Sequence, residues 1–201
     1  MQTFLKVVSA ILNPILLPFL GVLLLFHVGA FGELPMVYRL YIEGLVFLNM
    51  CVIPAFGVWL LKKSGHISDL DVSVRSERIF PYLITVICYS SACFLLYRYQ
   101  MPWWILKLFL GSTIAIIAAF FITLKWKISA HTMAFGCLIA SAFLVCLGQS
   151  IYPIKILSVL LMLAGIQASS RIYLEAHTLG QVCGGFTLGV CSVLCTFFLL
   201  P

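Results

Sequence analysis

WWILKLFLGSTIAIIAAFFITL, residues 103–124, is an almost unbroken apolar stretch that contains a single charged residue, Lys107, near its start. The hydrocarbon core of a bilayer is about 30 Å thick, and a helix needs about 20 mostly apolar residues to cross it. The stretch has 22 residues and is mostly apolar, so it is long enough and apolar enough to cross the bilayer. It therefore predicts a transmembrane helix, and the rest of the chain can be compared with it.

The composition of the whole chain also indicates a membrane protein. Hydrophobic residues make up 63% of the 201 residues and charged residues only 9%, against roughly 25% charged in ordinary soluble domains. A water-soluble fold of this size would lack the polar side chains to cover its surface. This excludes a disordered chain, a disulfide scaffold and a soluble nucleic-acid-binding protein. The eight cysteines lie in apolar stretches without a Cys-x-x-Cys pair, which is typical of small buried hydrophobic residues.

Seven segments have the length and apolar character of membrane spans. The first contains Pro14 and Pro18, which a membrane helix tolerates where its neighbours satisfy the freed carbonyl groups, and we expect it to be a retained span rather than a signal peptide. The sixth is short, so six spans remain an alternative. The sequence predicts an all-α polytopic transmembrane helix bundle of about six to seven spans, with residues 1–201 forming one integral membrane domain. The segments are residues 4–31, 37–61, 80–98, 103–124, 132–150, 154–170 and 178–199.

Most polar residues are predicted to lie on one face of the membrane. Short connections make neighbouring spans antiparallel, so loops that are separated by two spans emerge on the same side. This applies to residues 62–78, 124–132 and 169–178. We expect a functional site on this polar face.

The net charge of +6 points to an anionic partner, either lipid head groups or a phosphorylated ligand. The polar face carries eight cations and the opposite face three. The positive-inside rule would make the cation-rich face cytoplasmic. Five of its cations are also candidates for ligand binding, and without them the two faces are balanced, so the sequence leaves the orientation open. The eight are Lys6, Lys62, Lys63, Arg75, Arg78, Lys125, Lys127 and Arg171, and the three are Arg39, Arg98 and Lys155.

Two histidines at span ends of the polar face lie beside hydroxyl groups and cations. A helix N-terminus offers unpaired N–H groups to an oxyanion, arginine adds a planar fork for two phosphate oxygens, and an imidazole can act as nucleophile or proton donor. Together these groups predict a phosphate-transfer pocket. Interfacial polar residues without a function are the alternative, as we interpret His27 and His66. One cluster is Lys125, Lys127, Ser129, Ala130 and His131, and the other is Ser170, Arg171, His177 and Gln181.

Both clusters resemble signatures of the type 2 phosphatidic acid phosphatase superfamily, which contains membrane lipid phosphatases related to vanadium haloperoxidases. The resemblance covers residues 125–199 and includes two spans between the signatures and one closing span. Ser170-Arg171-x5-His177-x3-Gln181 resembles the third signature, Ser-Arg-x5-His-x3-Asp, and Ser129-Ala130-His131 resembles the second, Pro-Ser-Gly-His.

The resemblance implies a role for each matching residue. His177 would attack phosphorus and form a phosphohistidine, and His131 would protonate the leaving alcohol. Arg171 would hold the phosphate, and Ser129 and Ala130 would bind its oxygens, with Ser170 beside them. The family's reaction requires no metal and no cofactor.

The sequence departs from the family pattern at several positions. Ile128 replaces the proline of the second signature and Ala130 its glycine. Gln181 replaces the aspartate of the third signature. A neutral amide on the same helix face can orient His177, but it stabilises an imidazolium less than a carboxylate does.

The first family signature, Lys-x6-Arg-Pro, does not occur in that form. Arg75, Arg78 and Pro81 give a rearranged version of it, about fifty residues before His131. Lys125 and Lys127 are alternative donors. We expect Arg75 and Arg78 to act, with a contribution from Lys127.

The sequence therefore predicts a metal-independent membrane phosphatase that acts on a phosphorylated lipid, such as phosphatidic acid, phosphatidylglycerol phosphate, undecaprenyl diphosphate or a lipid A phosphate. Two alternatives stay open: a degraded relative that binds or transports such lipids, and a Mg²⁺-dependent prenyl-diphosphate transferase that uses Asp69 and Asp71. We expect the inner membrane of a bacterium, with the site periplasmic if the resemblance holds. Gly180-x3-Gly184 and Gly185-x3-Gly189 predict close helix packing inside the bundle.

Overall fold

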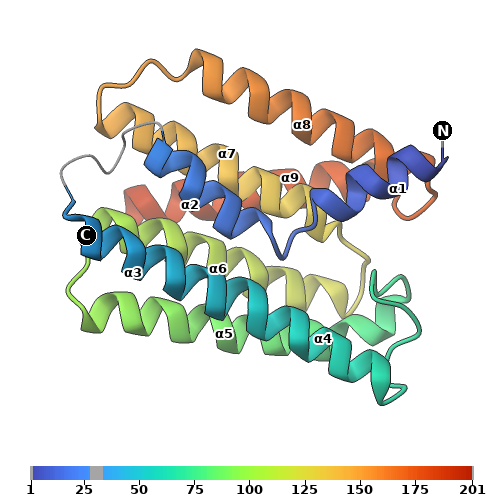
Figure 1. Cartoon of the computed structure of the whole chain (residues 1–201). Helices are drawn as coiled ribbons and strands as arrows, with labels where there is room; N and C mark the ends of the chain where they lie inside the picture. The colour runs from blue at the N-terminus through green and yellow to red at the C-terminus, as the bar shows by residue number, and fades with distance from the viewer. Residues whose placement is uncertain (1, 28–33, 201) are drawn as a thin grey trace.

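The computed structural model describes residues 2–27 and 34–200, and within these ranges all regular structure is helical. Six of the helices described there are long and apolar enough to cross a membrane, which confirms an all-α polytopic bundle (Figure 1). The elements are α1 (Gln2–Ile11), α2 (Leu17–His27), α3 (Met36–Val46), η1 (Phe47–Val52), α4 (Ile53–Lys63), η2 (Arg75–Arg78), α5 (Ile79–Arg98), α6 (Trp103–Thr123), α7 (Ala130–Gly148), α8 (Ile154–Tyr173) and α9 (Leu179–Leu199).

The N-terminal segment differs from the predicted continuous span over residues 4–31. It forms two short helices, and α2 with 11 residues is too short to cross the bilayer alone. The helix breaks at Asn13, because Pro14 has no N–H and disfavours a helical conformation in the residue before it. The Asn13 carbonyl accepts two backbone hydrogen bonds, and its side chain accepts a third from the Ile15 N–H. Residues 28–31 lie outside the described residues, and the described helices give six spans rather than seven.

The next span, Met36–Lys63, is a single apolar stretch made of α3, η1 and α4. Its centre is a π-helical turn, in which the Ile53 N–H donates to the carbonyl of Leu48, five residues earlier. Pro54 explains the turn, because it has no N–H for the ordinary helical hydrogen bond. The helix therefore continues through the proline without a break.

The central helix of the bundle is α7, the most buried of the six spans. α9 packs along it through glycines. A Cβ placed at Gly189 would lie 2.1 Å from the Met133 carbonyl oxygen, and one at Gly185 would lie 2.4 Å from the Ser129 carbonyl oxygen. Only glycine permits so close an approach of two backbones. The predicted packing seam thus lies inside the bundle, while Gly184 faces the Trp126 ring.

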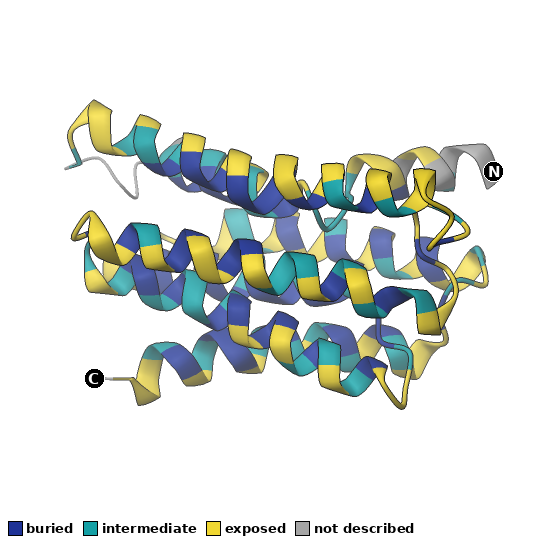
Figure 2. Cartoon of the chain, turned by 90° about the horizontal axis from the view of Figure 1, so that it is seen from below, coloured by how far each residue is buried: buried dark blue, intermediate teal, exposed yellow. Residues whose placement is uncertain are grey.

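The outer helices carry exposed residues along most of their length (Figure 2), and many of these residues are large and apolar. Examples are Val37, Ile87, Phe94, Leu147 and Phe198, each more than half exposed. A soluble protein rarely exposes apolar surface on this scale, whereas hydrocarbon is a suitable solvent for it. The chain is an integral membrane protein.

The three polar connections lie at one end of the bundle, as predicted (on the right in Figure 1). Hydrogen bonds link them directly. Arg78 donates to the Ile128 carbonyl, and Arg171 at the end of α8 donates to the carboxylate of Asp71. This polar end holds the candidate site.

Replacing Gly189 by alanine should destabilise the protein, because the new Cβ would overlap backbone atoms of α7 that cannot move aside. We expect a loss of about 1–3 kcal/mol, as for other overpacked cores, measured by thermal unfolding in detergent micelles. Gly165→Ala in α8 is the matched control, since nothing lies within 4 Å of its Cβ. Equal stability of the two variants would contradict the α7–α9 contact.

Candidate active site

His177 lies in the short connection between α8 and α9, and 5% of its surface is exposed. Its Nδ1 lies 2.9 Å from Oε1 of Gln181, and the same oxygen accepts the N–H of Thr178, the N-cap of α9. An amide oxygen only accepts hydrogen bonds, which assigns the proton to Nδ1. Nε2 therefore carries the lone pair, and it accepts a hydrogen bond from Arg78.

Arg78 is the hydrogen-bond partner of Nε2 of His177. The residue is 6% exposed, and its Nη2 lies 3.5 Å from Nε2 of His177. Two backbone carbonyls fix the guanidinium: Nε donates to Val72 at 2.9 Å and Nη1 to Ile128 at 2.7 Å. Neither partner carries a charge, so the positive charge of Arg78 is available to an anion.

Arg171 is the second buried arginine, with 2% of its surface exposed. Its Nη1 donates to Ser9 Oγ at 2.8 Å and to Asp71 Oδ2 at 3.3 Å, and the Asp71 side chain is 57% exposed. Among the described residues Nε of Arg171 is buried without a hydrogen-bond partner. The adjacent Ser170 points away from the site, since its hydroxyl donates to the Leu5 carbonyl in α1.

The second signature-like segment begins α7. Ser129 is fully buried, its hydroxyl caps the helix by accepting the Thr132 N–H, and its own N–H donates to the Gln181 carbonyl at 3.2 Å. Ser129 therefore has a structural role at the start of α7. Ala130 and His131 both line the cavity that His177 also lines.

The other predicted cations have different positions. Arg75 is exposed and donates to the carbonyls of Thr123 and Leu124, so it caps the C-terminus of α6 and does not reach the site. Lys125 is exposed to solvent. Lys127 lines a hollow together with His177 and Gln181. Of the cations predicted to replace the first signature, Arg78 and Lys127 are the ones beside His177.

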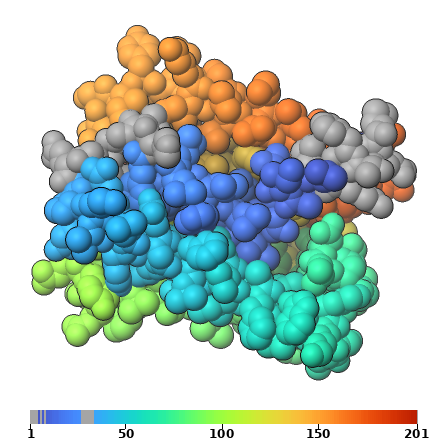
Figure 3. Space-filling view, viewed as in Figure 1, coloured from blue at the N-terminus to red at the C-terminus, as the bar shows by residue number. Residues whose placement is uncertain are grey.

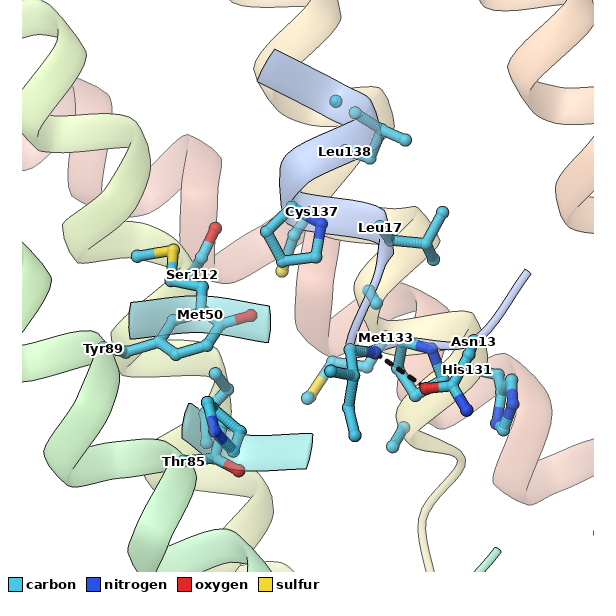
Figure 4. A pocket seen from close by; sticks show the side chains of 18 of the residues that line it. Asn13, Leu17, Met50, Thr85, Tyr89, Ser112, His131, Met133, Cys137 and Leu138 are labelled. Carbon is cyan, nitrogen blue, oxygen red and sulfur yellow. Dashed lines mark hydrogen bonds between the residues drawn. The ribbon is translucent and has the colours of Figure 1, made fainter. Parts of the chain in front are cut away.

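The site opens into an elongated cavity of about 220 Å³ (Figure 4). Asp71, Arg78, His131 and His177 form its charged and titratable end, and mostly aliphatic and aromatic side chains line the rest, with a few uncharged polar ones such as Ser112 and Ser141. In the space-filling view α1 and α2 cover the front of the bundle beside α3 and α4 (Figure 3). The cavity thus joins a cationic mouth to an apolar interior.

The electrostatics of the charged end of the cavity favour an anion and a neutral imidazole. Burial, followed by the charges of Arg78, Lys127 and Arg171, lowers the pKa of His177 to about 3, although the hydrogen bond with Gln181 opposes this shift. Burial and the same two arginines also lower the pKa of Lys127. His177 is therefore neutral at physiological pH and can act as a nucleophile.

The two aspartates proposed as an alternative Mg²⁺ site have separate partners. The carboxylate of Asp69 accepts the Ser73 N–H, whereas that of Asp71 pairs with Arg171. Within residues 2–27 and 34–200, no group of three or more acidic, histidine or cysteine side chains is placed to hold a metal ion. This arrangement gives no support to the alternative.

Three contributors to the site were not identified from the sequence. Ser9 binds Arg171, Asn13 lines the cavity, and the Val72 carbonyl binds Arg78. Asn13-Pro14 does carry a turn signal. Val72 has a φ of 47°, which is strained for a β-branched residue and is typical of functional sites, but no sequence pattern predicts it.

The ring of His177 should remain neutral well below the pKa of about 6.5 of an unfolded histidine. The unfolded chain then binds more protons than the folded chain between pH 6.5 and 3, so the contribution of His177 to stability falls as the pH falls through that range.

Gln181→Glu should raise the pKa of His177 by about one unit or more, because a carboxylate stabilises the imidazolium. Carbon-13 NMR of labelled histidine measures the pKa of His177 in the parent protein and in the Gln181→Glu variant. The same titration curve for the two proteins would contradict the contact between His177 and Gln181.

Comparison of the chain with protein-family models, characterised proteins and solved structures finds no match. The resemblance over residues 125–199 therefore depends on its signature residues alone.

Proposed function

We propose that the protein is an integral membrane phosphatase that hydrolyses a lipid phosphate or diphosphate through a phosphohistidine. The observation that carries the proposal is the buried, neutral ring of His177, held at Nδ1 by Gln181, with Nε2 3.5 Å from the guanidinium of Arg78. A phosphate bound to that guanidinium would bring its phosphorus close to Nε2, and such positioning supplies much of the rate of phosphoryl transfer.

The proposed reaction has two steps. In the first, Nε2 of His177 forms a bond to phosphorus and the bond from phosphorus to the lipid oxygen breaks. His131, protonated once the bound phosphate offsets the charges of Arg78 and Arg171, gives its proton to that oxygen. In the second, water attacks the phosphohistidine, passes a proton to His131, and releases phosphate with both histidines restored. Arg78, Arg171 and Lys127 would stabilise the charge on the transferring oxygens.

In the absence of substrate, Asp71 takes the place of a phosphate oxygen on Arg171. Its carboxylate contacts Nη1 at 3.3 Å, and more than half of its side chain is exposed. A phosphate dianion carries more charge than a carboxylate and can satisfy several donors at once. Substrate would therefore displace Asp71, and the buried Nε of Arg171 would gain a partner.

We also propose which lipids are the substrates, in which membrane the protein lies and which side of that membrane the site faces. The candidate substrates are the phosphorylated lipids named from the sequence, and the membrane is the inner membrane of a bacterium with the site on the periplasmic face. An impermeant thiol reagent tests the side through single cysteines at Ser76 and Thr178, in a background where the eight native cysteines are replaced.

Purified protein in lipid nanodiscs should release phosphate from one or more members of a lipid phosphate panel. We expect the reaction to survive EDTA and to be blocked by vanadate, which mimics the transferring phosphoryl group. His177→Ala should abolish turnover, whereas His66→Ala should not change it, because His66 is exposed and contacts Ser64. Turnover by His177→Ala, or inactivation by EDTA with rescue by Mg²⁺, would contradict the mechanism.

A lipid-binding protein without catalysis is the second candidate, and Gln181 is the observation that favours it. The amide accepts the His177 hydrogen bond without supplying the negative charge that would stabilise an imidazolium. Such a protein would bind lipid phosphates and release no phosphate. The panel therefore separates the two candidates.

Arg171→Lys should lower kcat/KM although it keeps the charge, because a planar fork is replaced by a point donor. We expect a loss of about 2–3 kcal/mol in transition-state stabilisation, the magnitude of a hydrogen bond to a charged group. Arg98→Lys is the control, because Arg98 is exposed and lies at the end of α5 that is far from the site. Equal kinetics of the two variants, both correctly folded, would remove Arg171 from the site.

A further inference from the structure

The cavity extends far below the two histidines. Tyr89 in α5 lies eleven residues after Arg78, and Ser141 in α7 lies eleven after Ala130, and all four line the cavity. At a rise of 1.5 Å per residue, each pair spans about 16 Å along its helix. The cavity therefore reaches the middle of a membrane about 30 Å thick.

One face of α6 continues the lining beyond this depth. α6 ends at the polar face with Thr123, and Ser112 lies eleven residues before that end. Ser141 lies eleven residues after the start of α7 at the same face, so the two serines lie at the same depth in the membrane. Leu108 and Ile105 also line the cavity, one and two turns deeper. Figure 4 shows Ser112 and Tyr89 on the side of the cavity away from His131.

The opposite side of α7 leaves no room for a second channel. There Gly185 and Gly189 bring the backbone of α9 against that of α7, and even a Cβ would lie 2.7 Å from the Thr132 hydroxyl or 2.8 Å from the Cys137 nitrogen. On the side of α9, therefore, the helices leave no space for a hydrocarbon chain. The cavity lined by α5, α6 and α7 is the space that could hold one.

We propose that the cavity binds one hydrocarbon chain of an amphiphile whose anionic head lies at Arg78 and His177, and that the chain passes beside Ser112 and Ser141 at mid-membrane depth. This inference rests on the proposed function for the identity of the head group. The cationic mouth selects the phosphate, and the single apolar channel selects lipids with one chain over lipids with two.

Ser112 offers a way to shorten the cavity. Its hydroxyl donates to the Leu108 carbonyl of its own helix, and its side chain also hydrogen-bonds the Cys137 thiol of α7. Ser112→Phe should fill the cavity at mid-depth, and Ser112→Leu is a smaller alternative that serves if the phenylalanine variant does not fold. Ile114→Phe is the matched control, because Ile114 is 45% exposed on the same helix and does not line the cavity.

The probes are alkylphosphonates. The proposed reaction breaks a bond between phosphorus and oxygen, whereas an alkylphosphonate joins its chain to phosphorus through carbon. The protein can therefore bind these compounds without hydrolysing them. A decyl chain is shorter than the depth of Ser112 and a hexadecyl chain is longer. We expect Ser112→Phe or Ser112→Leu to weaken binding of hexadecylphosphonate at least tenfold in nanodiscs, and to change binding of decylphosphonate less than twofold. Ile114→Phe should change neither.

Two further ligands test the number and the kind of chain. A two-chain glycerolipid phosphonate should bind at least tenfold more weakly than hexadecylphosphonate, and farnesylphosphonate shows whether an isoprenoid chain fits as well as a straight one. Equal binding of one-chain and two-chain ligands, or equal effects of Ser112→Phe on short and long chains, would overturn the inference even if phosphate is released. Chain-dependent binding without phosphate release would instead contradict the proposed function.

Discussion

Direct contact between the backbones of α7 and α9 determines where the candidate catalytic groups lie. Gly185 and Gly189 let the two helices touch, and the Thr132 hydroxyl then donates to the Val182 carbonyl at 2.8 Å. The contact holds the N-termini of both helices at the same level of the membrane. His131 and His177, almost fifty residues apart in the chain, therefore line one cavity. A side chain at either glycine would separate them.

The buried arginines illustrate how a charge can be kept in an apolar environment without being neutralised. Burying an unpaired ion costs a large desolvation energy. Arg78 offsets this cost with two backbone carbonyls, and Arg171 with a hydroxyl and one largely exposed carboxylate. Because most of these partners are neutral, the local potential remains positive. The same potential attracts an anion and keeps the imidazole of His177 unprotonated.

The fold could be predicted from sequence because hydrophobic length is a local property. The six later spans, the shared polar end and the packing of Gly185 and Gly189 all follow from composition, spacing and loop parity. The first segment was predicted as one continuous helix and forms two, because the effect of Pro14 depends on the hydrogen bonds that Asn13 can supply. Site prediction had a similar limit. Spacing paired His177 with Gln181, but only the three-dimensional arrangement shows that Ser129 and Arg75 cap helices whereas Arg78 reaches His177.

The break at Asn13 has a consequence for the order of assembly. Neither α1 nor α2 is long enough to form a stable span alone. α2 packs against α3 and η1, which follow it directly, but its contact with α7 and the contact of α1 with α8 involve helices that are synthesised more than a hundred residues later. The N-terminal segment therefore completes its packing only after the second half of the chain has been inserted. Because this segment also contributes Ser9 and Asn13, the part of the chain that is made first completes the site last.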